Sequence, residues 1–475
     1  MKSVVLNKIS TNFQGNDTDK TLFSKDKSLL KLLTCGSVDD GKSTLIGCLL
    51  HDTKHVYDDQ LSSLNQDSKR YGTQGMSLDY SLLVDGLKAE IEQGITIDVA
   101  YRYFSTKKRK FIIVDTPGHE QYTRNMVTGA STCSLSILLI DARKGMLEQT
   151  KRHAFISYLL GIKYLIVAIN KMDLVDYKHS VFYSISKQFL NFLKIAKFSF
   201  KVEFVPISAL LGENVVVSSV NMNWYTGLTL LRILEDIDIV FSHSNELIFP
   251  VQYVNRPNLD FRGYSGTIVA GKVHVNQQVK VLPSGLFTTI KKIVTFDGDL
   301  SVAQLGQSIT LVLNDNIDIS RGDIIVDTRS ILHPVRELFI DMIWMSEKSM
   351  RIKDFYLMQV AGKRVKIHIK DILYHQNIND FTKVSATKLQ LNCIGYVHII
   401  CDEPIIVDLY KNNKIMGGLI FIDLITNITV GAGIVRKIID LNNSVITKDM
   451  KLFEIELNSL ICRYFPEWKM KKINK

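Results

Sequence analysis

Eight residues near the start of the chain read Gly36-Ser37-Val38-Asp39-Asp40-Gly41-Lys42-Ser43. They follow a short apolar run at 29–33 and precede a segment at 44–50 whose apolar residues recur at helical spacing. A strand, a glycine-rich turn and a helix form the context in which a G-x-x-x-x-G-K-[ST] pattern builds a phosphate-binding loop. The glycines let backbone N–H groups turn inward, and the helix N-terminus favours negative charge. The pattern predicts a nucleoside triphosphate site.

Two polar side chains of this loop have specific predicted roles. Lys42 can reach the β- and γ-phosphates, where it would assist catalysis, and the Ser43 hydroxyl can ligate the accompanying Mg²⁺. The residues that we expect to contact the nucleotide here are Gly36, Ser37, Val38, Asp39, Asp40, Gly41, Lys42, Ser43 and Thr44.

The pattern around this loop predicts an α/β domain followed by two antiparallel β-barrels. Apolar runs at 29–34, 99–104, 111–115, 136–141, 164–170 and 202–207 alternate with helical patterns. Such alternation is typical of a mostly parallel sheet with right-handed crossovers. After about residue 245, short strands separated by turn residues predict closed barrels, since closure removes exposed edges. We expect an arm at 1–28, a phosphate-loop domain at 29–243, barrels at 244–331 and 332–440, and a tail at 441–475.

A second motif, Asp115-Thr116-Pro117-Gly118-His119, follows the apolar run that ends at Val114. A carboxylate at a strand end can hold the metal, and the Gly118 N–H can bond the γ-phosphate. His119, directly after this turn, is the candidate to orient the attacking water. Upstream, Thr96 can reach Mg²⁺ and the γ-phosphate only when GTP is present, which predicts a switch segment. No arginine finger is evident, so we expect slow hydrolysis that depends on a partner.

Two further motifs select the base. Asn170-Lys171-Met172-Asp173 follows a buried run, and the Asp173 carboxylate can take two hydrogens that guanine offers and adenine does not. The Lys171 stem can lie on the ring, while Asn170 ties neighbouring loops together. Ser208-Ala209-Leu210 follows the next strand, where a backbone N–H can meet guanine O6. Together these motifs predict that the nucleotide is GTP.

Composition indicates a globular protein without an obvious nucleic-acid surface. The net charge is +10, but the lysines are scattered along the chain, and we expect no nucleic-acid partner. The six cysteines show no ligand spacing and predict buried thiols in a reducing compartment. No apolar stretch reaches the length of a membrane span, so we expect no membrane partner and a cytoplasmic location.

Longer stretches carry a resemblance to a known family. Residues 94–97 and 115–119, in front of two barrels, resemble the translational GTPase superfamily, as in elongation factor Tu. A closer resemblance is to the GTPase (large) subunits of bacterial ATP-dependent sulfate adenylyltransferase (ATP sulfurylase). The stretches that carry it are 35–47, 67–75, 94–104, 118–126, 253–264 and 317–323. The match runs from about residue 29 to about residue 435.

The resemblance implies the GTPase subunit of a nucleotidyltransferase. A smaller catalytic subunit would carry the site where ATP and sulfate become adenosine 5′-phosphosulfate and pyrophosphate. Formation of the phosphosulfate anhydride is strongly uphill, and GTP hydrolysis would drive it. In the superfamily, Val38 and Ile95 would flank His119 as an apolar gate.

Three positions depart from the translation-factor or family pattern. Asp40 stands where translation factors commonly have histidine, which favours the sulfate branch. Ile91 replaces an expected arginine of the switch region, and Ser134 an expected aspartate. Two alternatives stay open: a translation-factor-type GTPase that binds tRNA or the ribosome, and a subunit that binds GTP without coupling.

Overall fold

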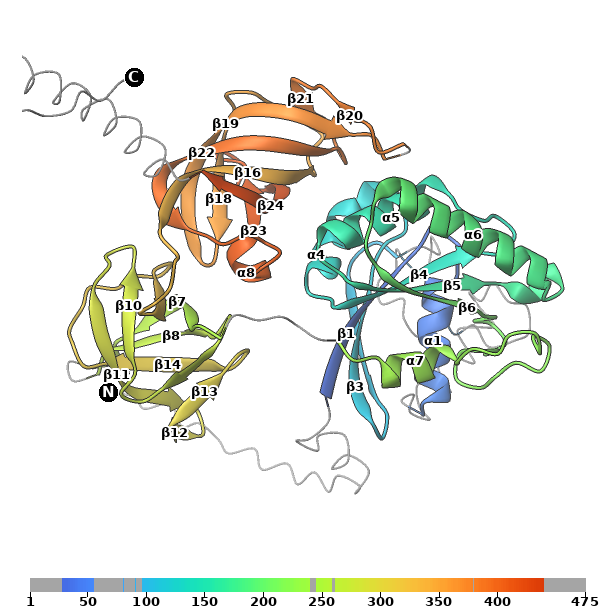
Figure 1. The fold of residues 1–475 in the computed structure, drawn as a ribbon, viewed down its shortest axis with the longest axis horizontal. Helices are drawn as coiled ribbons and strands as arrows, with labels where there is room; N and C mark the ends of the chain where they lie inside the picture. Colours follow the sequence, from blue (N-terminus) through green and yellow to red (C-terminus); the bar gives the residue numbers. More distant parts are fainter. Residues whose placement is uncertain are drawn as a thin grey trace, which may run out of the picture. The chain divides into compact units, whose positions relative to one another are not determined.

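The computed structural model describes residues 28–54, 80, 90, 96–239, 245–258, 261–378 and 380–439. The predicted N-terminal arm, apart from Ser28, and the C-terminal tail lie outside these residues, as do Ile91 and Ile95. The chain divides into two compact units between Ile239 and Val240 (Figure 1). The finer domain limits given above stay predictions.

The first unit is built on one six-stranded sheet with the order β2-β3-β1-β4-β5-β6. Its strands are β1 (Ser28–Cys35), β2 (Ala100–Ser105), β3 (Arg109–Asp115), β4 (Leu135–Asp141), β5 (Tyr164–Asn170) and β6 (Lys201–Pro206). Every neighbouring pair is parallel except β2 with β3. All six predicted strands are therefore confirmed, each within two residues of its observed limits.

Helices cover both faces of this sheet. They are α1 (Lys42–Asp52), α4 (Thr123–Ser131), α5 (Glu148–Leu159), α6 (His179–Ala196) and α7 (Leu230–Asp236), with short 3₁₀ turns at η3 (Glu120–Tyr122) and η4 (Met172–Val175). In Figure 1, α1 and α7 lie on one face, and α4, α5 and α6 on the other. Every residue of β4 is buried, which explains its unbroken apolar sequence, since strands of a parallel sheet are covered on both sides. Polar loops can therefore emerge only at the strand ends.

The second unit begins with a closed antiparallel barrel. Its six strands are β7 (Ile248–Asn255), β8 (Gly263–Thr267), β10 (Gln278–Leu282), β11 (Phe287–Thr295), β14 (Ser308–Leu313) and β15 (Ile324–Asp327), and β10 pairs with β11 to close the ring. The short strands β9 (Lys272–His274), β12 (Gly298–Leu300) and β13 (Val302–Gln304) flank it. In β14, buried residues alternate with more exposed ones, the pattern from which a barrel wall is predicted.

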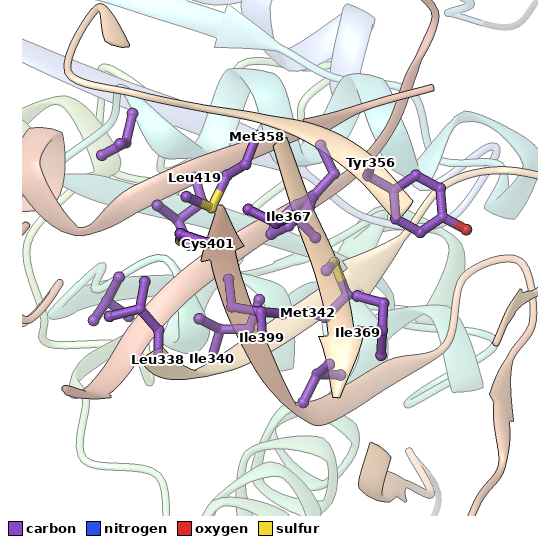
Figure 2. Packing of buried hydrophobic residues seen from close by; sticks show 14 of the residues in the cluster. Leu338, Ile340, Met342, Tyr356, Met358, Ile367, Ile369, Ile399, Cys401 and Leu419 are labelled. Carbon is purple, nitrogen blue, oxygen red and sulfur yellow. The ribbon is translucent and has the colours of Figure 1, made fainter. Parts of the chain in front are cut away.

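A second closed barrel follows in the same unit. Its strands are β16 (Pro334–Trp344), β18 (Phe355–Val360), β19 (Lys363–Gln376), β22 (Ile394–Ile406), β23 (Gly418–Ile422) and β24 (Thr429–Ile439), and β18 pairs with β19 to close it. Short strands β17 (Met350–Arg351), β20 (Lys383–Val384) and β21 (Lys388–Leu389), and the turn α8 (Lys414–Gly417), complete it. Figure 2 shows its core, in which Leu338, Ile340 and Met342 alternate along β16 and pack with residues of the facing strands.

The two barrels share a small buried cluster. Ile248, Val269 and Ile324 of the first pack with Ile406 and Met416 of the second. The side-chain amide of Asn413 donates to the Val269 carbonyl over 3.1 Å. The two predicted barrels thus form one compact unit.

Two further expectations concern cysteines and membranes. The described cysteines, Cys35, Cys48, Cys133, Cys393 and Cys401, are all free thiols. Within the described ranges, no helix has both the length and the apolar character that a bilayer crossing requires.

Candidate nucleotide site

The predicted phosphate loop joins the end of β1 to the start of α1, at the carboxyl edge of the sheet. Gly41 immediately precedes α1 and has φ 93°, a left-handed conformation that favours glycine. A Cβ there would also lie 2.4 Å from Nδ2 of Asn170. Glycine is therefore required at this position both by the backbone angle and by the close approach of the base-selecting loop.

Lys42 and Gly118 bring two of the predicted motifs into contact. The Lys42 ammonium donates to the carbonyls of Ser37 at 2.9 Å and Gly36 at 3.2 Å. A Cβ on Gly118 would lie 2.7 Å from Lys42 Nζ and 2.7 Å from the Gly36 carbonyl oxygen. The Asp115-to-His119 turn therefore packs directly on the phosphate loop, and only glycine fits at this contact.

Asp40 turns its side chain into the phosphate loop. Its Oδ2 accepts the Ser37 N–H over 2.6 Å, and the side chain is almost fully buried. Burial raises the pKa of Asp40 to about 6, against the opposing attraction of Lys42. Its backbone carbonyl accepts from the amide of Asn170 over 2.8 Å. The carboxylate thus braces the loop from within, a role that the motif alone does not specify.

Asp115 ends β3 and is completely buried. Its Oδ1 accepts from the Thr34 hydroxyl over 3.0 Å, while its Oδ2 has no hydrogen-bond partner among the described residues. Burial raises the pKa of Asp115 to about 6, and the charge of Lys42 and the bond from Thr34 oppose that shift. An unpaired buried carboxylate oxygen at this edge is suited to a hard cation such as Mg²⁺.

The base-selecting residues meet at the same edge. Asn170, at the end of β5, accepts the Ala209 N–H on Oδ1 over 2.9 Å and donates to the phosphate loop on its other side. The Ser208 hydroxyl donates to Asp173 Oδ1 over 2.6 Å. Leu210 is half-buried beside them. One amide side chain therefore links the phosphate loop to the turn after β6.

Lys171 is fixed by an aspartate that the motifs did not indicate. Its ammonium lies 2.5 Å from the Asp39 carbonyl oxygen and 3.2 Å from Asp141 Oδ2. Asp141 ends β4 and has no exposed surface in its side chain. Its position in the sequence could have indicated this role, because Asp141 directly follows the apolar run at 136–140. A residue at the carboxyl end of a parallel strand lies at the edge of the sheet where ligands bind.

Thr96 and His119 are two predicted site residues that are not fully buried. Thr96 is half-buried and His119 is exposed, with its Nδ1 accepting the Gln121 N–H over 3.3 Å. Neither hydrogen-bonds to the phosphate loop in the part of the chain that the structure describes. Beside Thr96, the buried carboxylate of Glu90 accepts the N–H groups of Ile97 at 2.9 Å and Asp98 at 3.2 Å. The motifs did not indicate this role of Glu90.

These features define a class of protein: a phosphate-loop GTPase domain in front of two closed antiparallel barrels. In agreement, the family described as the elongation factor Tu GTP binding domain matches residues 27–248. The family described as GTP-eEF1A C-terminal domain-like matches residues 338–436.

Curated relatives identify the family. Sulfate adenylyltransferase subunit 1 of Erwinia tasmaniensis is 57% identical over 448 residues, which cover 94% of both chains. The protein of the same name from Buchnera aphidicola is 57% identical over 448 residues, or 94% of this chain and 95% of the relative. This chain belongs to the sulfate adenylyltransferase subunit 1 family. Among solved structures, sup35 complexed with GDP covers 90% of this chain and 98% of its own, at 21% identity and a TM-score of 0.41.

Proposed function

We propose that this chain binds and hydrolyses GTP, and that a smaller catalytic subunit uses this hydrolysis to make adenosine 5′-phosphosulfate and pyrophosphate from ATP and sulfate. The family membership supports the sulfate branch over a translation-factor function, because the relatives match over nearly the whole chain. The proposal that the nucleotide is GTP rests on one observation. The phosphate loop, Asn170, Asp173 and Ser208 lie together at one edge of the sheet.

The nucleotide would lie along this edge with its base at Asp173 and its phosphates on the loop. Lys42 now donates to two loop carbonyls, and a bound β- or γ-phosphate would offer it stronger, charge-assisted acceptors. The backbone N–H groups at the start of α1 would add donors for the phosphates. The carboxylate of Asp173 would accept from guanine, and a backbone N–H of the turn at Ser208-Ala209-Leu210 would donate to guanine O6.

Mg²⁺ fits the residues at this edge. Ser43 offers a hydroxyl oxygen and Asp115 a carboxylate with one unpaired oxygen, the hard donors that Mg²⁺ prefers, and Thr96 would add a second hydroxyl once the switch segment closes on GTP. The ion would neutralise charge that develops on the phosphates. This chain's own contribution is to hold those oxygens in place, with Thr34 fixing the orientation of Asp115.

Hydrolysis also needs a positioned water. His119 is the candidate, since it follows Gly118, which packs on the phosphate loop. Because its side chain is exposed, His119 would enter the site through a rearrangement. Rapid GTP cleavage would then require the partner to stabilise His119 in the site. This requirement would couple GTP hydrolysis to adenosine 5′-phosphosulfate formation. We place both reactions in the cytoplasm.

Phosphate release from GTP tests this proposal. The purified chain is mixed with the catalytic subunit, with and without ATP plus sulfate, at fixed Mg²⁺. We expect rapid release only when partner, ATP and sulfate are all present, together with stoichiometric adenosine 5′-phosphosulfate. A Lys42→Ala chain, prepared in the same way, controls for contaminating GTPases. A slow rate that is the same in every mixture would contradict coupling, and stimulation by ribosomes instead would favour the translation-factor alternative.

A further inference from the structure

Asp141, whose buried carboxylate joins two cations at the site, has no role in the function proposed above. Asp141 pairs in register with Asn170 at the carboxyl edge of the sheet. Its carboxylate accepts from Arg143, with Nη2 to Oδ2 at 2.7 Å and Nε to Oδ1 at 3.1 Å, and lies 3.2 Å from Lys171 Nζ. Taking a carboxylate out of water is unfavourable unless its partners are well placed, as these are.

Lys171 is held from two sides by this cluster and the phosphate loop. Its ammonium is shared between Asp141 and the Asp39 carbonyl, and its backbone lies in the left-handed region, with φ 64°. Both ends of the residue are therefore fixed, which leaves the aliphatic stem little freedom between them. Such a stem can present a preformed apolar surface to a ring.

Arg143 is the second cation bound to Asp141. Its side chain is 45% exposed although its head is bonded to Asp141. The bond to Asp141 is the main cause of the raised pKa of Arg143, and Asp173 and Asp39 add to it. The guanidinium therefore shares the Asp141 carboxylate with Lys171.

We propose that Asp141 is a positioning residue for the guanine nucleotide, which fixes Lys171 so that its stem covers the face of the base and its ammonium ties this loop to the phosphate loop. The inference rests on the GTP site proposed above. Asp141 itself touches no nucleotide in this scheme. Because GTP and GDP present the same base face, the contact contributes equally to both and to the transition state.

The test is Asp141→Asn, with binding measured by titration of fluorescent GTP and GDP analogues. Loss of a charge-assisted bond predicts that both affinities fall by the same factor, about 10- to 100-fold. The kcat at saturating GTP should stay unchanged while KM rises. ITP, which lacks the exocyclic amine of guanine, should lose affinity by the same factor as GTP, since the ring face and not Asp173 is affected.

A matched control is Asp236→Asn, which also removes a carboxylate held by two cations, Lys108 at 3.0 Å and Arg232 at 2.8 Å. Lys108 immediately precedes β3, at the opposite end of that strand from Asp115, so this cluster lies away from the site. We expect native affinity in the control. Native GTP affinity in Asp141→Asn, or a changed ratio of GTP to ITP affinity, would overturn the proposal.

A second variant protects the test against misfolding. If Asp141→Asn gives no cooperative melting transition, Asp141→Glu keeps the charge but moves the carboxylate by one methylene. It should still weaken GTP and GDP equally, and native affinity in this variant would again overturn the proposal. Failure of the unmodified chain to bind GTP at all would instead refute the proposed function.

Discussion

The buried histidine of α5 should make the protein sensitive to acid. His153 lies on α5 and is 3% exposed, and its Nδ1 has no hydrogen-bond partner among the described residues. Burial lowers the pKa of His153 to about 3, and the positive charges of Lys42 and Arg152 add to this effect. The folded protein therefore keeps the ring neutral, whereas the unfolded chain can protonate it near its ordinary pKa of 6.5.

The sign and size of the effect follow from linkage. Below pH 6.5 the unfolded state binds a proton that the folded state does not, so stability falls as the pH falls, until it levels off near the folded pKa of about 3. A pH of 5 lies about 1.5 units below the pKa of the histidine in the unfolded chain. Protonation of the unfolded state therefore lowers the free energy of unfolding by about 2 kcal/mol at this pH. At pH 7 the same term is only about 0.2 kcal/mol.

The variant His153→Leu removes this term, because leucine cannot be protonated. Urea unfolding of the native and variant chains, without nucleotide, is measured at pH 7 and pH 5. The loss of unfolding free energy between the two pH values should be about 2 kcal/mol smaller in the variant. Asp40 and Asp115, whose raised pKa values act in the opposite direction, are common to both chains and cancel in this double difference. Replacement of an exposed histidine, His333→Leu, is the control, and an identical pH dependence in native and His153→Leu proteins would refute the reasoning.

Three substitutions test the site directly. Asp173→Asn should lower GTP affinity at least about 100-fold and favour xanthosine triphosphate, which competition binding measures; unchanged guanine preference would refute the base assignment. His119→Ala should slow partner-stimulated hydrolysis about 100-fold or more while analogue binding changes little, and an equal loss of both would indicate a structural role. Gly118→Ala should weaken binding of a non-hydrolysable GTP analogue about tenfold, because its Cβ would clash with Lys42 and the Gly36 carbonyl; native affinity would show that the loops can separate freely.

The sequence predicts the layers of this fold because burial leaves different patterns in different elements. The runs that became β4 and β5 are apolar at nearly every position, since helices cover both faces of a parallel sheet. In β14 and in the middle of β16, buried residues alternate with less buried ones, because one face lines a barrel and the other does not. The patterns predict closed barrels but not which strands pair to close each ring, here β10 with β11 and β18 with β19, since register between strands depends on side chains distant in sequence.

The site is predictable to the extent that its chemistry is local. Phosphate-loop backbone geometry is encoded within eight consecutive residues, and a strand before it is enough to place it. The partners of Asp40 and Asp141 are not encoded in this way. Asp40 could equally have faced solvent, and its bond to the Ser37 N–H arises from a turn in which Asp39 has φ 66°. Asp141 meets Lys171 only because β4 and β5 align Asp141 with Asn170.

The close approach of Gly41 to Asn170 links the phosphate-binding and base-binding parts of the site. Asn170 donates to the Asp40 carbonyl and accepts from Ala209, so its amide can satisfy both bonds only when the phosphate loop and the turn after β6 are correctly spaced. Gly41 sets that spacing, since any Cβ there would lie 2.4 Å from the amide nitrogen. A larger residue at 41 would therefore push apart the loops that hold phosphate and base, and weakened phosphate binding should be accompanied by weakened guanine selectivity. The absence of a side chain at Gly41 therefore couples recognition of the phosphates to recognition of the base.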